Sequence, residues 1–120
     1  MNFDYAESIG ALDADQRVYF YQLLAHFMTV SMRGILFHEG VADEERIERA
    51  KWLNEIQHRI TYKIFLLKKN SSDYPEEEIW DMIRQNSNKH PKTADDVNLA
   101  IETSFKYVLE NEGDSARAGN

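Results

Sequence analysis

The sequence predicts an all-α fold, a four-helix up-down-up-down antiparallel bundle. Two observations predict it. Stretches whose apolar residues recur with helical spacing are separated by short breaks rich in Gly, Asn, Ser and Pro. No stretch alternates apolar and polar residues as a half-buried strand does. Short connections between helices favour antiparallel neighbours, and 120 residues are enough for one domain with a core.

The stretch 18–37 is the centre of the predicted bundle. Its polar residues Gln22, His26, Thr29 and Arg33 fall in one narrow stripe on a helix, and nearly all its other positions are apolar. A helix that is apolar over most of its circumference lies in a core or spans a membrane. An arginine near a bilayer centre costs about 2.5 to 3.5 kcal/mol. We therefore expect a central core helix and no membrane association.

Capping residues and helix breakers set the expected boundaries. Asp13 followed by Gln16 forms a capping-box pattern, Asp43 is placed to cap the second helix, and Thr93 is placed to cap the fourth. Gly40 suits the position after a helix end. These signals predict helices over residues 14–38, 43–69, 74–89 and 93–111.

The two ends of the chain differ in composition. Residues 1–12 contain several large apolar side chains, so we expect this N-terminal segment to dock on the bundle. Residues 112–120, EGDSARAGN, are predicted to be a disordered tail, so the domain spans 1–111. The apolar helix faces predict a core of Leu23, Leu24, Phe27, Val30, Ile35, Leu53, Ile56, Ile60, Ile79, Ile83, Ile101, Phe105 and Val108.

Charge and cysteine content exclude several classes of function. The net charge of −7 disfavours nucleic acid as a partner, because phosphate binding needs a surplus of Lys and Arg on some face. The same charge is compatible with a basic protein partner. Without cysteine there can be no disulfide, thiolate zinc site or cysteine nucleophile. The first ten residues lack the basic region of a signal peptide, so we expect a cytoplasmic protein.

A polar cleft between the first two helices is the first candidate site. On the second helix one face carries Glu48, Trp52, Glu55, Arg59 and Tyr62. If the two helices fold antiparallel about residues 39–42, Arg33 comes level with Glu48, His26 with Glu55, and Gln22 with Arg59. Either these groups form ion pairs along a solvated groove, or they line a cleft that binds a ligand, metal or partner. The candidate ligand-binding residues are Gln22, His26, Arg33, Glu48, Glu55, His58 and Arg59.

Metal binding is a second possibility. Glu55 and His58 form a Glu-x-x-His motif that is similar to those of ferritin-like di-iron bundles, which use two copies plus two further Glu residues. Only one copy is present, so we expect no tightly bound metal and no cofactor. A site formed by His26, Glu55 and His58 is the alternative.

The third candidate is a ribonuclease motif. Arg84 and His90 are spaced as in the Arg-x(4–6)-His pattern of the HEPN helical ribonucleases, and this similarity implies RNA cleavage across a dimer. Arg33 and His38, with four intervening residues instead of five, also match the pattern, and about 0.7 such matches arise by chance in a chain of this composition. Together with the acidic net charge, this leads us to expect no ribonuclease activity.

The second half of the second helix is apolar on nearly every side. Trp52, Tyr62, Phe65 and Leu66 lie outside its core stripe, and we expect them to form the interface of a homodimer. The expected function is therefore non-enzymatic: protein–protein binding by a small cytosolic regulatory adaptor or immunity-like inhibitor. The alternative is a ligand- or metal-binding helical bundle with its polar site between the first two helices.

Overall fold

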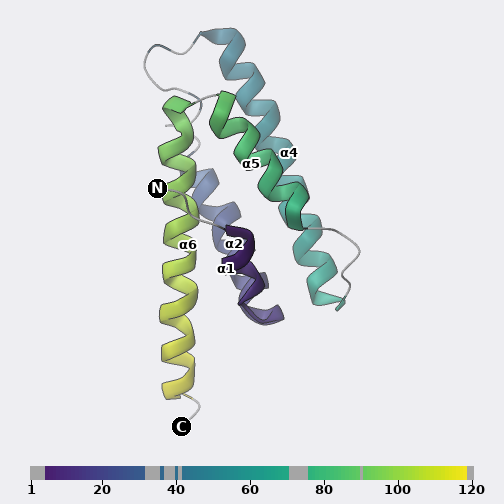
Figure 1. Ribbon diagram of the computed structural model, residues 1–120, viewed down its shortest axis with the longest axis vertical. Coiled ribbons are helices and arrows are strands. Elements are labelled where there is room, and N and C mark those ends of the chain that lie inside the picture. Colours follow the sequence, from purple (N-terminus) through teal and green to yellow (C-terminus); the bar gives the residue numbers. More distant parts are fainter. Residues whose placement is uncertain are drawn as a thin grey trace.

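A computed structural model shows an all-helical protein (Figure 1). It describes residues 5–31, 36, 40, 42–70, 76–89 and 91–118, excluding the side chains of 5–6, 91–93 and 111–118. No strand occurs in these ranges, which confirms that the fold is all-α. The described helices are α1 (Tyr5–Gly10), α2 (Ala14–Val30), α4 (Asp43–Lys68), α5 (Glu76–Lys89) and α6 (Pro91–Ala118).

The capping box predicted at Asp13 begins α2. The Gln16 main-chain N–H donates to Asp13 Oδ1 at 2.8 Å, and the Asp13 main-chain N–H donates to Gln16 Oε1 at 2.9 Å. Two helix-end donors are thereby satisfied. The helix ends at Val30 with Ser31 as its C-cap, earlier than the expected end at residue 38. The segment 32–35, which includes Arg33 and Ile35, lies outside the described residues.

The prediction that Asp43 caps α4 is wrong. Ala42 occupies the N-cap position without a side-chain hydrogen bond, and Asp43 is the first helical residue. There the Asp43 carboxylate accepts a hydrogen bond from Arg46 Nη1 at 2.9 Å. Its negative charge also interacts favourably with the positive end of the helix dipole. Asn70 ends the helix in a left-handed conformation, φ 57°, a backbone state that asparagine tolerates better than most residues.

Helix α6 begins earlier than expected because Pro91 is its first residue. Proline suits the first helical position, where its missing N–H would have no partner within the helix. Thr93 therefore lies inside the helix and is not its cap. The backbone continues as helix to Ala118, through most of the segment that we expected to be disordered.

The helices form a connected set around one core. Helix α2 packs against α4 and α6, α5 packs against the same two helices, and α1 lies against α5. Figure 1 shows α4 and α6 running downward and α5 running upward, so α5 is antiparallel to both α4 and α6. Ile9 of α1 is fully buried. None of the described helices has the length and apolar character that a bilayer-crossing helix requires.

Phe20 of α2 lies at the centre of the core. Its ring centroid is 5.4 Å from that of Tyr21, 6.1 Å from that of Trp80 and 4.4 Å from that of Phe105. These aromatic residues join α2, α5 and α6. The buried residues that the sequence predicted are Leu24, Leu53, Ile56, Ile60, Ile79, Ile83, Ile101, Phe105 and Val108.

Part of the predicted core on α2 is wrong. Val30 is 64% exposed, while Leu23 and Phe27 are only partly buried. Val30 follows His26 by four residues, so it lies one turn further along the exposed face of the helix. The buried side of α2 is instead formed by Phe20, Tyr21, Leu24 and Met28.

Candidate functional site

A groove lies between α4 and α5, and the polar face of α4 forms one side of it. The groove has a volume of about 380 Å³. Its α4 side carries four of the five residues whose spacing in the sequence placed them on one helix face, and Tyr62 is the one that does not line it. The lining residues are Glu48, Trp52, Glu55 and Arg59 from α4, and Met82, Gln85, Asn86 and Lys89 from α5.

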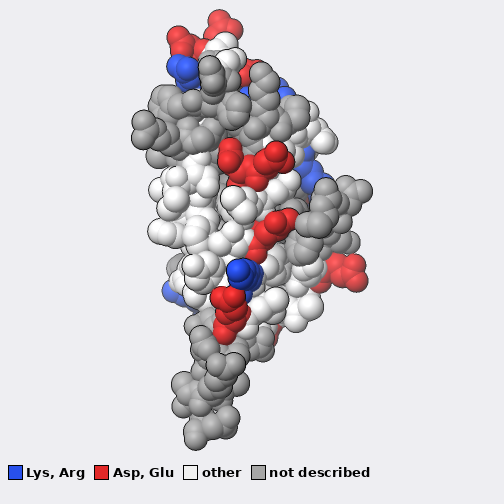
Figure 2. All heavy atoms as spheres, turned by 90° about the vertical axis from the view of Figure 1, so that its left-hand side faces the viewer, with Lys and Arg blue, Asp and Glu red and all other residues white. Residues whose placement is uncertain are grey.

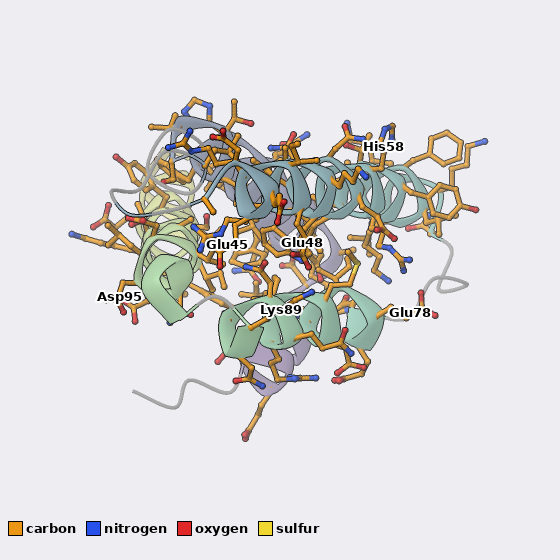
Figure 3. All side chains as sticks on the ribbon, turned by 90° about the horizontal axis from the view of Figure 1, so that it is seen from above. Glu45, Glu48, His58, Glu78, Lys89 and Asp95 are labelled. Carbon is orange, nitrogen blue, oxygen red and sulfur yellow. The ribbon has the colours of Figure 1, made fainter. Side chains whose placement is uncertain are left out.

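Ion pairs lie at both ends of the groove. At one end, Lys89 of α5 pairs with Glu48 of α4, and Figure 3 shows these two side chains pointing toward each other between the helices. Toward the other end, Arg59 lies 3.0 Å from Glu55 Oε1 and 3.2 Å from Glu78 Oε2. All five side chains are at least partly exposed, so water screens their attraction.

Two less exposed side chains lie between these ion pairs. Trp52 is partly buried and donates its indole N–H to the main-chain oxygen of Met82 at 3.2 Å. Asn86 lines the groove although it is only 5% exposed. Its side-chain Nδ2 has no hydrogen-bond partner among the described residues. Buried amide groups are nearly always hydrogen-bonded, so an unpaired donor beside a groove requires an explanation.

The predicted pairing of His26 with Glu55 is wrong. Gln57, not Glu55, faces α2, where its Nε2 donates to Thr29 Oγ1 at 2.8 Å. Two positions along a helix correspond to about 200° of rotation, which directs Glu55 away from α2 and toward α5. His26 is exposed and packs edge-on against Phe27, with ring centroids 5.3 Å apart.

Gln22, the predicted partner of Arg59, is exposed. Arg59 pairs with Glu55 and Glu78 instead, as described above. Glu48 pairs with Lys89, and Arg33 lies outside the described residues. The structure thus brings Glu48, Glu55 and Arg59 to one site and leaves Gln22 and His26 on a different surface.

The alternative metal site is not assembled. Figure 3 shows His58 projecting from the side of α4 that faces away from α5, whereas Glu55 lines the groove. Within the described ranges, no group of three or more His, Cys, Asp or Glu side chains is arranged to hold a metal ion. His26, Glu55 and His58 therefore do not form a common ligand set.

The residues expected at a dimer interface do not share one environment. Tyr62 and Phe65 are 52% and 50% exposed and stack with ring centroids 6.5 Å apart. Lys69 places its Nζ 4.5 Å from the centre of the Phe65 ring. In contrast, Leu66 is buried in the protein itself, and Trp52 belongs to the groove.

A polar cluster around the buried Lys63 was missed by the sequence analysis. Glu76 Oε1 lies 3.5 Å from Arg17 Nη1 and 3.9 Å from the buried Lys63 Nζ. Burial lowers the pKa of Lys63. Burial also raises the pKa of Tyr21, and the nearby Glu76 carboxylate raises it further. Arg17 also donates from Nε to the Ile9 carbonyl at 3.2 Å, so the cluster connects α1, α2, α4 and α5.

A sequence signal for Lys63 does exist. It follows Ile56 and Ile60 and precedes Leu67 at intervals of four, three and four, so it occupies a core position of α4. Arg49 extends the same stripe in the other direction and is also buried. Charged residues on an otherwise apolar stripe predict buried ion pairs.

The ribonuclease motif is described only in part, because His90 and His38 lie outside the described residues. Arg84 pairs with Asp81 and with Glu77, the latter at 3.1 Å, and the Asp81 carboxylate raises the pKa of the guanidinium. Arg84 is therefore held by two acidic side chains of its own helix.

Comparisons with protein-family models, with curated proteins and with solved structures found no match to this chain. The functional argument therefore depends on the geometry of the molecule.

Proposed function

We propose that this protein acts by binding another protein, without catalysis, and that the groove between α4 and α5 is its contact site. The observation that carries the proposal is the composition of the groove. An aromatic residue, Trp52, lies between the Glu48–Lys89 and Arg59–Glu55 ion pairs. Protein interfaces typically combine a central aromatic anchor with a polar, solvated rim.

Charge supports a basic partner. The chain has a net charge of −7, and Figure 2 shows Asp and Glu side chains distributed over one face of the molecule. An acidic surface accelerates association with a basic protein and disfavours acidic partners. We infer a cytosolic regulatory adaptor or an immunity-like inhibitor that covers a basic surface of its target.

We further propose that the helices form an up-down-up-down bundle with α1 docked on it, and that two copies associate. The exposed Tyr62–Phe65 pair on α4 supports a two-fold contact, because a symmetric interface buries the same patch of both copies and such patches favour aromatic residues. Leu66 is excluded from this contact since it is buried within the chain.

A small-molecule ligand is the second candidate, now placed in the α4–α5 groove. The groove volume of about 380 Å³ falls within the range of roughly 300 to 1,000 Å³ that is usual for such sites. A ligand of this kind would stabilise the protein when it binds, in the absence of any peptide.

Selection from a random-peptide display library tests the proposal. The library is selected on the unmutated protein and counter-selected on Trp52→Ala and, separately, on Gln85→Trp. The second variant fills the groove from an exposed position of α5, so it leaves the core intact. Both variants are checked for helicity by circular dichroism.

We expect peptides that bind the unmutated protein and neither variant. Glu102→Gln, an exposed substitution on α6, is the control and should retain every selected peptide. If no selected peptide depends on the groove, the proposed function is wrong. Stabilisation by a small molecule in a thermal-shift screen, lost in Gln85→Trp, would then support the second candidate.

A further inference from the structure

We propose that the groove binds an arginine or lysine side chain presented by an extended segment of the partner protein. Trp52 supplies the surface on which the cationic side chain lies, and Glu48 and Glu55 supply the negative charge. Asn86 donates to a main-chain carbonyl of the segment once its amide turns into the groove. This inference rests on the proposed function, because it names the chemistry of the partner at the same groove.

The spacing on α4 suits a cation. Glu48 precedes Trp52 by four residues and Glu55 follows it by three, so the indole lies between two carboxylates on one helix face. The helical rise separates those two positions by about 10 Å along the axis. A guanidinium or ammonium group over the indole is attracted by the ring and remains within reach of a carboxylate on either side.

The protein's own cations already occupy these carboxylates. Lys89 reaches across from α5 to Glu48, and Arg59 lies 3.0 Å from Glu55. Lys89 can be displaced readily, because its side chain is 63% exposed and an exposed ion pair contributes little to stability. Arg59 also contacts Glu78 at 3.2 Å, so it keeps an acidic partner when an incoming cation takes Glu55.

Asn86 provides the second, independent observation. It lines the groove with Trp52, and its Nδ2 has no partner among the described residues. The nitrogen itself is out of contact with solvent, so the amide has to turn into the groove to meet an incoming acceptor. An amide nitrogen can only donate, so the missing partner is an acceptor oxygen. The main-chain carbonyls of an extended peptide are such acceptors, and they lie close to its side chains. Asn86 therefore points to a peptide as the source of the cation.

An acidic segment fits the same groove poorly. Among the described residues, the cations Arg59 and Lys89 are paired with three acids, namely Glu48, Glu55 and Glu78. An incoming carboxylate would have to displace one of these acids and remain close to the others. Like charges at that distance oppose binding, and the net charge of the chain opposes it further.

Fluorescence titration with defined peptides tests the inference. The probes are the blocked pentapeptide Ala-Ala-Arg-Ala-Ala and two versions in which citrulline or glutamate replaces the arginine. Citrulline keeps the shape of the side chain and removes its charge. The protein has two tryptophans, of which Trp80 is fully buried, so a change in emission reports on Trp52.

We expect saturable binding of the arginine peptide, about tenfold weaker binding of the citrulline peptide, and none of the glutamate peptide. The double variant Glu48→Gln/Glu55→Gln should weaken arginine binding by about the same factor. Glu77→Gln is the matched control, because it removes a carboxylate charge of the same kind outside the groove. In the unmutated protein, the side-chain amide protons of Asn86 should shift in the NMR spectrum on titration.

Equal binding of the arginine and citrulline peptides, or preferred binding of the glutamate peptide, would overturn the basic-residue assignment. Unshifted Asn86 amide protons would overturn the role of that residue. If display yields groove-dependent peptides without arginine or lysine, this inference is wrong while the proposed function stands. If display yields no groove-dependent peptide, both are wrong.

Discussion

Trp52 of α4 donates its indole N–H to the main-chain oxygen of Met82 on α5, 3.2 Å away. The hydrogen bond fixes the ring at the boundary between the two helices, with the ion pairs Glu48–Lys89 and Arg59–Glu55 on either side. A fixed aromatic ring loses little conformational freedom when a partner binds it. The same contact also connects α4 to α5.

Trp52→Phe removes this donor and keeps an aromatic ring. We expect the free energy of unfolding to fall by about 1 kcal/mol, the usual contribution of one hydrogen bond. Urea unfolding followed by circular dichroism measures it. The variant should still bind the selected peptides, but more weakly than the unmutated protein does, because phenylalanine attracts a cation less strongly than tryptophan. Unchanged stability would mean that the indole N–H bond does not hold α4 to α5.

Two positions on α2 test which face of that helix is buried. Leu24→Ala should lower the free energy of unfolding by about 2 to 5 kcal/mol, because Leu24 is fully buried and its loss leaves a cavity. Val30→Ala on the same helix should change it by less than about 0.5 kcal/mol, since Val30 is 64% exposed. Similar losses at both sites would contradict the orientation of α2.

Glu76 should matter more for stability than its neighbour Glu77. Glu76→Gln leaves the buried Lys63 and Arg17 without their shared carboxylate, so we expect a loss of about 1 to 3 kcal/mol in unfolding free energy. Glu77 makes an exposed ion pair with Arg84, and Glu77→Gln should cost at most about 1 kcal/mol. Equal losses for the two variants, measured by urea unfolding, would show that the cluster is not structural.

Tyr21 should make the protein less stable in alkaline solution. Burial raises the pKa of Tyr21 in the folded state, whereas the unfolded chain loses this proton near pH 10. Above pH 10 the folded state therefore binds more protons than the unfolded state, and stability falls as the pH rises.

Tyr21→Phe removes this effect. Relative to the variant, the unmutated protein should lose up to about 1.4 kcal/mol per pH unit above pH 10. The lowered pKa of Lys63 acts oppositely, raising stability as the pH approaches the ordinary lysine value, but it is present in both proteins and cancels in the comparison. Parallel pH profiles would contradict the burial of the Tyr21 hydroxyl.

The homodimer proposal predicts that Phe65→Glu converts dimer to monomer and leaves the protein helical. Leu109→Glu introduces the same charge at an exposed apolar position of α6 and should leave the dimer intact. Sedimentation at low micromolar concentration and physiological salt, where the Debye length is about 8 Å, distinguishes the species. A single monomeric species for the unmutated protein would refute the dimer.

The helices could be predicted from local signals, and most of the core from periodicity. The capping box at Asp13 is a contact between residues three positions apart, so the sequence alone specifies it. The same holds for the core stripe Leu53, Ile56 and Ile60. The cap at Asp43 failed because an acidic residue is equally favourable in the first turn, where the structure places it.

The site could be predicted only on one of its two sides. Periodicity correctly placed Glu48, Trp52 and Arg59 on one face of α4, but it does not specify which helix that face meets. That choice depends on the packing of all the helices. Lys89 and Asn86 come from α5. No spacing in the sequence indicates that these residues of α5 lie beside the polar face of α4.

Hydrogen exchange tests the central claim, that the groove between α4 and α5 is the protein-binding site. Exchange of backbone amides is measured by mass spectrometry with and without the tightest peptide selected by display. We expect slower exchange in residues 48–59 and 82–89, and unchanged exchange in residues 99–109 of α6, in the unmutated protein but not in Gln85→Trp. Protection confined to α6 or to residues 62–69, or retained in Gln85→Trp, would contradict the assignment of the groove.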